Sequence, residues 1–313
     1  MKDFDVLLSL VEKHPLRKVA VAVAQDSSVI QAMAEAWKRN IAQSVLVGDE
    51  REIREVAEAT GSSLDGMTIV NEADSLRGVA RAVSMVSAGE ADILMKGYVH
   101  TDDFLRGVLN KEYGLRSGTI MSHVFVAEVR EWNKLVFITD GAMNISPNLE
   151  QKAMILLNAV HLANTFGVMK PKVAVLAAVE LVNPAMQATL DAAALAAMAN
   201  RSQFVPECTV DGPFALDNAV SPEAARHKKI GGPVAGQADI LLVPDIEAGN
   251  MLAKSFVYFA NCRLVGLLVG AKTPVVLTSR ADSMESKLLS VAGAVLMVNM
   301  KRVLQLKIGK VHY

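Results

Sequence analysis

The chain has 313 residues, of which 51% are apolar and 21% are charged. This composition excludes an intrinsically disordered chain, because such chains contain too few apolar side chains to build a core. The net charge of -1 argues against a general nucleic-acid-binding protein, which would carry an excess of Lys and Arg. At about 150 residues per domain, the length predicts two domains.

The mean hydropathy of +0.29 is high enough to suggest a membrane protein. Whether the chain has a membrane-spanning segment depends on where the apolar residues lie in the sequence. No run of about 20 uncharged apolar residues is present. The longest candidate, residues 264–277, is interrupted by Gly270, Lys272 and Pro274. The acidic N-terminus does not resemble a signal peptide. Two cysteines, Cys208 and Cys262, are too few for a disulfide framework or a Cys-rich zinc site. These features predict a cytoplasmic protein without a membrane segment.

The first half of the chain alternates between strand-like and helix-like segments. Its strand-length runs are rich in Val, Ile and Leu without strict alternation, which is typical of parallel strands covered on both faces. They are residues 19–24, 44–47, 67–70, 93–95 and 135–139. Amphipathic stretches between them predict helices over residues 27–37, 50–59 and 74–88, the first capped by Ser27 or Ser28.

The pattern restarts after residues 144–147. A long helix over residues 149–166 is interpreted as a connector between two units. Further helices are predicted over residues 184–199, near 222, over 247–260 and over 283–298, and strands over 172–177, 207–210, 238–243, 264–269 and 275–277. The alternation indicates an α/β fold of two doubly wound αβα domains with a cleft between them. Because ligands of such folds bind at the carboxyl ends of strands, the residues after each strand are the candidates.

The first candidate segment is residues 96–106, KGYVHTDDFLR, which follows the strand at 93–95. Gly97 permits a tight turn, Thr101 is positioned to cap the next helix, and Arg106 lies about one turn into that helix. Lys96, backbone N–H groups and Arg106 would then converge on an anion at the helix N-terminus. The alternative is an ordinary strand-to-helix turn with solvated charges.

Two further segments end strands in polar residues. In residues 137–147, Asp140 and Asn144 follow a strand and a glycine, which fits either a ligand site or an Asx-turn. In residues 243–254, Asn250 and Lys254 are four positions apart and share a helix face. The alternative for this second segment is a capped surface helix.

The fourth segment, residues 278–283, places the hydroxyl of Ser279 beside Arg280 just before a helix. Arginine binds phosphate through paired donors, and a serine can donate to a developing negative oxygen. The alternative is that Ser283 simply caps the helix and Arg280 lies in solvent.

Several common motifs are absent. There is no Walker A pattern, no metalloprotease pattern and no nucleophile elbow. The glycine-rich residues 231–236 precede a strand, so they do not form a dinucleotide-binding fingerprint. The six histidines are scattered without metal-ligand spacing, which predicts that no metal is bound.

Together, four stretches resemble the phosphotransacetylase/phosphotransbutyrylase family. They are KGYVHTDDFLR, ITDGAMNISP, VAGQADILLVPDIEAGNMLAK and TPVVLTSRADSMESK, in the order and at the spacing of that family over nearly the whole chain. The second and fourth look more like the butyryl branch than the acetyl branch.

The resemblance implies the reversible conversion of a short-chain acyl-CoA, such as butyryl-CoA, and phosphate to acyl phosphate and CoA. Coenzyme A is then a substrate, and no bound cofactor is implied. The family fold is shared with isocitrate and isopropylmalate dehydrogenases. It implies one discontinuous domain of residues 1–148 and 266–313, and a second of residues 149–265. A homodimer is also implied, as is metabolic coupling to an acyl kinase.

By the same resemblance, Ser279 would stabilise the carbonyl oxyanion or the departing thiolate, and Arg280 and Arg106 would bind phosphate or the CoA phosphates. Substrate-binding residues would be Lys96, His100, Thr101, Ser122, Asp140, Asn144, Asn250 and Lys254. Acetyl-type members carry an aspartate as proposed base seven residues after that serine. Here the position holds Ser286, and the candidate bases are Asp282 and Glu285.

The residues leave the acyl group and the reaction class open. The acyl group could be acetyl, since each methylene contributes only about 1–3 kcal/mol of discrimination. Met121, Phe125 and Met143 either line the acyl pocket or merely fill the core. Three rival functions are an acyl-carrier-protein:phosphate acyltransferase, an NAD(P)-dependent decarboxylating dehydrogenase and a catalytically silent acyl-CoA sensor. The sequence shows neither the basic block expected of the first nor the aspartates that the second needs for Mg²⁺.

Overall fold

The computed structural model describes residues 1–129, 132–304 and 310–312. By their contacts, these residues form two units. The first unit comprises Phe4–Thr119 and Leu264–Leu304, and the second comprises Met1–Asp3, Ile120–Arg263 and residues 310–312. Within the described residues, no helix is long and apolar enough to cross a membrane.

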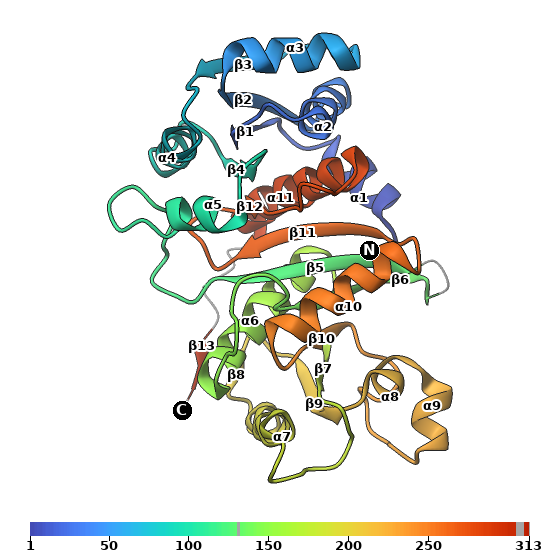
Figure 1. Cartoon of the computed structure of the whole chain (residues 1–313). Coiled ribbons are helices and arrows are strands. Elements are labelled where there is room, and N and C mark those ends of the chain that lie inside the picture. The colour runs from blue at the N-terminus through green and yellow to red at the C-terminus, as the bar shows by residue number, and fades with distance from the viewer. Residues whose placement is uncertain (130–131, 305–309, 313) are drawn as a thin grey trace. The chain divides into compact units, whose positions relative to one another are not determined.

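The sheet of the first unit has the strand order β3-β2-β1-β4-β12-β11 (Figure 1). From β3 to β12 neighbouring strands are parallel, and β11 runs antiparallel to β12. The strands are β1 (Arg17–Ala22), β2 (Ala42–Gly48), β3 (Met67–Asn71), β4 (Ile93–Lys96), β11 (Arg263–Val269) and β12 (Val275–Val276). Almost every residue of β1, β2 and β4 is buried, as expected of strands covered on both faces.

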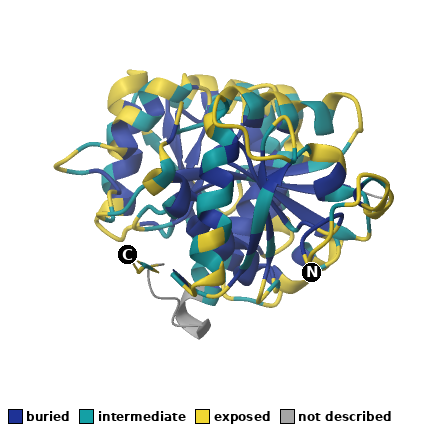
Figure 2. Cartoon of the chain, turned by 90° about the horizontal axis from the view of Figure 1, so that it is seen from below, coloured by how far each residue is buried: buried dark blue, intermediate teal, exposed yellow. Residues whose placement is uncertain are grey.

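Helices cover both faces of this sheet. On one face α4 packs on β1 and β2 and α5 packs on α4, and on the other α2 and α11 pack against each other (Figure 1). The helices are α1 (Phe4–Val11), α2 (Ser27–Lys38), α3 (Glu50–Thr60), α4 (Ser75–Ser87), α5 (Thr101–Val108) and α11 (Met284–Leu304). The strands are buried and the outer sides of the helices are exposed (Figure 2).

In the second unit the strand order is β5-β6-β10-β7-β9. β5 and β6 form an antiparallel pair, and the other neighbours are parallel. The strands are β5 (Ser122–Val129), β6 (Lys134–Thr139), β7 (Lys172–Leu176), β9 (Thr209–Phe214) and β10 (Ile240–Leu242), with a separate antiparallel pair of β8 (Phe204–Val205) and β13 (Lys310–Val311).

Both faces of this second sheet are also covered. Val136 and Ile138 of β6 belong to a core cluster that includes Ala219 and Ala225 of α8 and α9, whereas the intervening Phe137 meets Phe166 beside α6. The helices are α6 (Leu149–Thr165), α7 (Gln187–Asn200), α8 (Leu216–Val220), α9 (Pro222–His227) and α10 (Ile246–Tyr258). The side chains of α6 are buried for most of its length, which accounts for part of the high mean hydropathy.

A buried ion pair joins two of these helices. Nζ of Lys152 in α6 lies 2.7 Å from Oδ2 of Asp191 in α7, and the side chains are 6% and 5% exposed. Gln187 donates a second hydrogen bond to this carboxylate. Removing either charge would leave the other buried without a counter-ion, which is costly.

The α/β class and the strand–helix alternation predicted from the sequence are confirmed, with differences in detail. Residues 122–129 form β5, which the sequence analysis does not predict. The apolar run of this strand is interrupted by His123 and Glu128. β9 extends through Pro213, beyond the predicted end at residue 210, because proline is tolerated in a strand at the edge of a sheet. The predicted N-cap Ser27 or Ser28 is wrong, since Asp26 accepts the N–H of Val29 at 2.9 Å.

Helix α6 also differs from the sequence interpretation. It is a helix as predicted, but it packs on β5, β6 and β10 inside the second unit and does not connect two units. The chain passes between the units at residues 3/4, 119/120 and 263/264 and again after Leu304, whereas the predicted domain boundaries lie at residues 148 and 265. Residues 120–148 belong with the second unit because β5 pairs with β6 and β6 pairs with β10.

Candidate functional site

In the first unit, candidate residues gather at one edge of the sheet. β1, β4 and β12 are parallel neighbours, so their carboxyl ends share an edge. Three segments leave it, residues 23–26 after β1, residues 96–97 at the end of β4 and residues 277–283 after β12. Helices α2, α5 and α11 begin shortly after these segments, and helix N-termini favour anions.

Lys96 is a buried cation at this edge, with 2% of its surface exposed. Its Nζ donates to the carbonyl oxygen of Gly97 at 3.4 Å. Burial, together with the charges of Arg280 and Lys287, lowers the pKa of Lys96 to about 8, whereas Asp282 and Asp26 act in the opposite direction. Lys96 therefore loses its charge within a range of pH in which an ordinary lysine keeps it.

Gly97 allows β4 to end against the loop after β1. Its N–H donates to the carbonyl of Ala22 at 2.9 Å, and the N–H of Tyr98 donates to that of Val23 at 2.6 Å. A Cβ at Gly97 would lie 2.1 Å from the carbonyl oxygen of Val23, so a larger residue does not fit. The guanidinium of Arg280 lies 5.8 Å from the centre of the Tyr98 ring, within the range of a cation–π contact.

Ser279 and Arg280 lie in a tight turn that leads into α11. The N–H of Ser279 donates to Oδ2 of Asp282 at 2.7 Å, and Oγ of Ser279 accepts the N–H of Ala281 at 3.3 Å. Ser279 and Arg280 are both exposed. Ser283 accepts the N–H of Ser286 at 3.1 Å and so caps α11, as one of the two sequence interpretations expects.

Lys287, the last residue of the stretch TPVVLTSRADSMESK but not one of the predicted site residues, lies beneath this turn. Its side chain is buried, and Nζ donates to the carbonyl oxygens of Asp282 at 2.7 Å and of Ser279 at 3.2 Å. Burial lowers the pKa of Lys287, and Asp26 and Asp282 oppose this shift. Asp26 therefore belongs to the same cluster of charged residues as Lys96 and Lys287. Like Lys287, it is not among the site residues predicted from the sequence.

The residues of α5 are arranged differently from the prediction. His100, not Thr101, occupies the N-cap position of α5, and it makes no side-chain capping bond. Arg106 is 74% exposed and pairs with Asp103 one turn away at 2.8 Å. The charges that shift the pKa of Lys96 are those of Arg280, Lys287, Asp282 and Asp26. The convergence of Arg106 and Lys96 on one anion stays a prediction.

In the second unit, Asp140 organises the loop after β6. Its buried carboxylate accepts the backbone N–H groups of Ala142 at 3.0 Å, Met143 at 3.1 Å and Asn144 at 3.2 Å, and Nδ2 of Asn144 at 2.6 Å. Asn144 also donates to the carbonyl of Met121 at 2.9 Å. The Asx-turn interpretation of Asp140 therefore describes its contacts in the structure.

A pair of glycines joins this loop to α10. A Cβ at Gly249 would lie 2.7 Å from the carbonyl oxygen of Asp140, and one at Gly141 would lie 3.0 Å from the carbonyl carbon of Gly249. Nδ2 of Asn250 donates to the carbonyl of Gly141 at 3.1 Å. Lys254, one turn further along α10, is exposed.

The remaining predicted residues of the second unit face inward. Ser122 is fully buried, and its Oγ accepts Nδ2 of Asn158 in α6 at 2.9 Å. This contact directs Ser122 toward α6. Met121 is 3% exposed, Phe125 packs against the core cluster, and Met143 is half-buried. Met121 and Phe125 thus have the surroundings of core residues.

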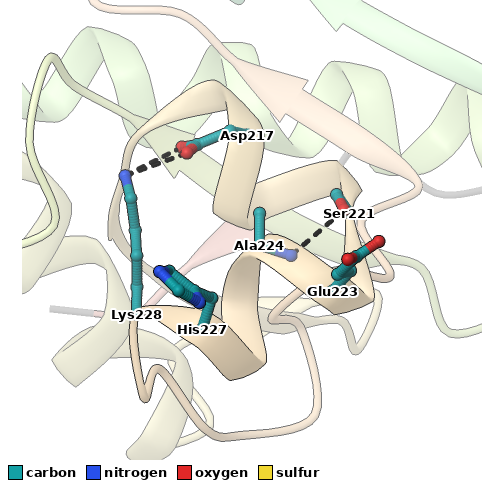
Figure 3. A pocket seen from close by; sticks show the side chains of 6 residues that line it. All are labelled: Asp217, Ser221, Glu223, Ala224, His227 and Lys228. Carbon is teal, nitrogen blue, oxygen red and sulfur yellow. Dashed lines mark hydrogen bonds and ion pairs between the residues drawn. The ribbon is translucent and has the colours of Figure 1, made fainter.

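A pocket of about 330 Å³ lies beside α8 and α9 in the same unit (Figure 3). Its lining includes Asp217, Ser221, Glu223 and His227, together with Lys228, whose Nζ lies 3.0 Å from Oδ2 of Asp217. A hydrogen bond from Lys228 lowers the pKa of Asp217. None of the predicted site residues lines this pocket, and two of its charged side chains, Lys228 and Asp217, pair with each other.

No group of three or more His, Cys, Asp or Glu side chains is arranged to hold a metal ion in the part of the chain that the structure describes. The absence of a bound metal stays a prediction from the sequence.

Comparison with known proteins gives consistent matches along the chain. The family model described as "Phosphate acetyl/butaryl transferase" matches residues 5–80 and 76–295. A phosphate butyryltransferase of Clostridium beijerinckii is 51% identical over 295 residues, which cover 94% of this chain and 97% of that protein. A phosphate acetyltransferase of Thermotoga maritima is 46% identical over 280 residues, which cover 88% and 93%.

Comparison with solved structures gives matches to the same family and to a related fold. A branched-chain phosphotransacylase from Enterococcus faecalis superposes with a TM-score of 0.80 at 36% identity, covering 90% of this chain and 99% of that chain. A putative 4-hydroxythreonine-4-phosphate dehydrogenase from Salmonella typhimurium gives a TM-score of 0.54 at 12% identity, covering 90% and 99%. This second likeness concerns the fold alone and agrees with the predicted dehydrogenase-like architecture.

The contact between Gly97 and the loop after β1 yields a stability prediction. In Gly97→Ala the new Cβ would meet the carbonyl oxygens of Val23 at 2.1 Å and Ala22 at 2.7 Å. Because both are backbone atoms, the strand ends must separate, and we expect the free energy of unfolding in urea to fall by about 2–3 kcal/mol.

Gly78→Ala in α4 is the matched control, since the nearest atom that its Cβ would meet beyond the backbone of its own helix is 3.7 Å away. This change should leave stability unchanged or raise it by up to about 1 kcal/mol, because alanine favours helix. Equal stability of the two variants would contradict the role assigned to Gly97.

Proposed function

The chain belongs to the phosphate acetyl/butyryl transferase family, and from this membership we propose that it converts a short-chain acyl-CoA and inorganic phosphate reversibly to an acyl phosphate and CoA. The observation that carries the proposal is the 51% identity to a phosphate butyryltransferase over 94% of this chain. Butyryl-CoA or a similar thioester is therefore the proposed acyl donor. Acetyl-CoA is the second candidate, supported by the 46% identity to a phosphate acetyltransferase.

The proposed chemistry is a direct transfer in a ternary complex. A phosphate oxygen attacks the thioester carbonyl carbon, and the carbonyl oxygen becomes an oxyanion. The C–S bond then breaks, the electron pair stays on sulfur, and CoA leaves as a thiolate that takes up a proton. No residue needs to carry the acyl group, and no resident cofactor is required because CoA is itself a reactant.

Both reactants are anions, so the reaction needs cations that hold them together. Lys96 and Arg280 supply two positive charges at the carboxyl edge of the first sheet, beside the start of α11. We assign phosphate to this edge. Arg106, exposed on α5, and Lys254, exposed on α10, are assigned to the phosphate groups of CoA.

Ser279 is the proposed donor to the developing negative charge. Its Oγ already accepts the N–H of Ala281, so the hydroxyl hydrogen can be donated to a substrate atom. An exposed donor fixed by the turn fits the stabilisation of an oxyanion or a departing thiolate.

In the reverse direction the thiol of CoA must lose a proton before its sulfur attacks the acyl phosphate, and Asp282 and Glu285 remain the two candidate bases for that proton. Asp282 is partly buried and accepts the N–H of Ser279 at 2.7 Å, so it also holds the turn. Glu285 is exposed in the first turn of α11. Asp282 would therefore combine a role as base with a role in holding the turn.

The second unit is proposed to contribute through the loop after β6. Asp140 and Asn144 hold the loop in shape, and Asn250 ties it to α10. His100 and Thr101, at the start of α5, and the buried Ser122 complete the predicted set of binding residues. For Ser122 the contact with Asn158 supports an indirect role, through the placement of β5 against α6.

The proposal extends to the setting of the enzyme. A homodimer and coupling to an acyl kinase that consumes the acyl phosphate rest on the resemblance, whereas a cytoplasmic location rests on the sequence features given above. All three stay predictions. A silent acyl-CoA sensor is the alternative of a different class.

The assay that tests the function is the release of CoA from butyryl-CoA. We expect purified protein to release CoA when phosphate is present and not when it is omitted, because phosphate is the nucleophile. Comparing acetyl-, propionyl-, butyryl- and isobutyryl-CoA ranks the acyl groups. Release without phosphate would indicate a thioesterase, and no release under either condition would favour the sensor.

Replacing Ser279 tests its role in the transition state. Ser279→Ala should lower kcat by about 10²-fold or more, because the donor to the negative oxygen or sulfur is lost. Ser63→Ala, at an exposed serine of the same unit, is the control and should keep the wild-type rate. A wild-type kcat in Ser279→Ala would remove this hydroxyl from the mechanism.

The lowered pKa of Lys96 predicts a pH dependence of phosphate binding. Lys96 is charged below about pH 8 and neutral above it, so its attraction for phosphate is present at low pH and lost as the pH rises. The KM for phosphate should therefore increase between about pH 8 and pH 9.5. In Lys96→Arg the guanidinium stays charged, so the increase should disappear. A flat KM in the wild type across this range would contradict the assignment.

A further inference from the structure

Lys287 holds both ends of the turn that carries Ser279 and Arg280. Its ammonium group donates to the carbonyl oxygen at the start of the turn, that of Ser279, and to the one at its end, that of Asp282. The backbone N–H of Lys287 donates to the carbonyl of Ser283 at 3.1 Å. The ammonium group of Lys287 thus fastens the turn, whereas its backbone N–H makes an ordinary helical bond to the residue that follows the turn.

The position of this lysine is energetically demanding. Its side chain is 2% exposed, and the following Leu288 and Leu289 are buried in the core. A buried ammonium group is costly unless hydrogen bonds and opposite charges compensate it. Here the two carbonyls and the carboxylates of Asp26 and Asp282 provide that compensation.

We propose that Lys287 is a positioning residue of the acyl-transfer site, whose buried ammonium group fixes the Ser279–Asp282 turn and so places the Ser279 hydroxyl and Arg280. This inference rests on the proposed function for the roles of Ser279 and Arg280. The contacts of Lys287 with the turn do not depend on that function.

A second effect follows from the charge of Lys287. Lys96 is surrounded by Arg280 and Asp282 from the turn after β12, by Lys287 from α11 and by Asp26 from the loop after β1. Lys287 and Arg280 disfavour the charged form of Lys96, and the two carboxylates favour it. Removing the charge of Lys287 therefore lets Lys96 keep its proton to a higher pH.

The test compares Lys287→Met, which removes the charge at similar length, with Lys287→Arg, which retains it. In Lys287→Met we expect kcat to fall by about 10–100-fold, because a displacement of about 1 Å at a reacting group has an effect of this size. The pH at which the KM for phosphate begins to rise should move upward. Lys287→Arg should recover most of the loss in kcat.

Lys152→Met is the matched control, because it also removes a buried lysine, 4% exposed, but from the second unit. It should lower the melting temperature and leave the pH dependence of the KM for phosphate unchanged. If Lys287→Met also lowers only the melting temperature and leaves kcat unchanged, the positioning role is wrong. A pH dependence that does not move would contradict the effect of the charge of Lys287 on Lys96.

Hydrogen exchange separates this inference from the proposed function. The amides of Ser279 and Asp282 are bonded inside the turn, so they should exchange faster in Lys287→Met than in the wild type and Lys152→Met. This result would support the hold on the turn even if the wild type showed no phosphate-dependent CoA release. Unchanged exchange at both amides would overturn the inference whatever the activity.

Discussion

Two buried ammonium groups, those of Lys96 and Lys287, lie at the carboxyl edge of the first sheet, and the surrounding structure depends on how their charges are compensated. Lys287 is stabilised by the carbonyls of Ser279 and Asp282, which close the turn after β12. Asp26 favours the charged form of both lysines while its carboxylate also caps α2. The turn, the helix cap and the buried charges are therefore coupled, and a change at one of them alters the others.

In the second unit, a buried negative charge is compensated at the carboxyl edge of the sheet. There the buried charge is the carboxylate of Asp140, and the N–H groups of the loop that follows it provide the compensation. Gly141 and Gly249 allow α10 to approach this loop at backbone distance, and Asn250 joins the two. In both units a buried ionised side chain orders the segment after a strand, by donating to carbonyls in one and by accepting from N–H groups in the other.

The sequence predicts the α/β class because apolar runs of strand length and amphipathic runs of helix length are local patterns. It also predicts which segments follow the strands, since the order of elements places them there. It does not predict that Lys287 lies beneath the turn, because that depends on the rotation of α11 about its axis against the sheet. The ion pair of Arg106 with Asp103 and the burial of Ser122 against α6 depend on tertiary contacts in the same way. The predicted cap of α2 falls too late in the chain because Asp26 and the serines after it are all good N-cap residues.

The arrangement of charges bears on why phosphate would bind at this edge. Burial and the charges of Arg280 and Lys287 disfavour the charged form of Lys96. The carboxylates of Asp282 and Asp26 offset this effect only in part. An anion that binds at this edge is attracted by each cation, and its negative charge reduces the repulsion among the cations. Binding therefore stabilises the charged form of Lys96. In the proposed reaction, the dianion that must approach a thioester then supplies the counter-charge that the edge lacks. The exposed Ser279 hydroxyl lies on a turn that one of these cations, Lys287, holds in place. The binding of phosphate is therefore linked to the placement of the hydroxyl that stabilises the transition state.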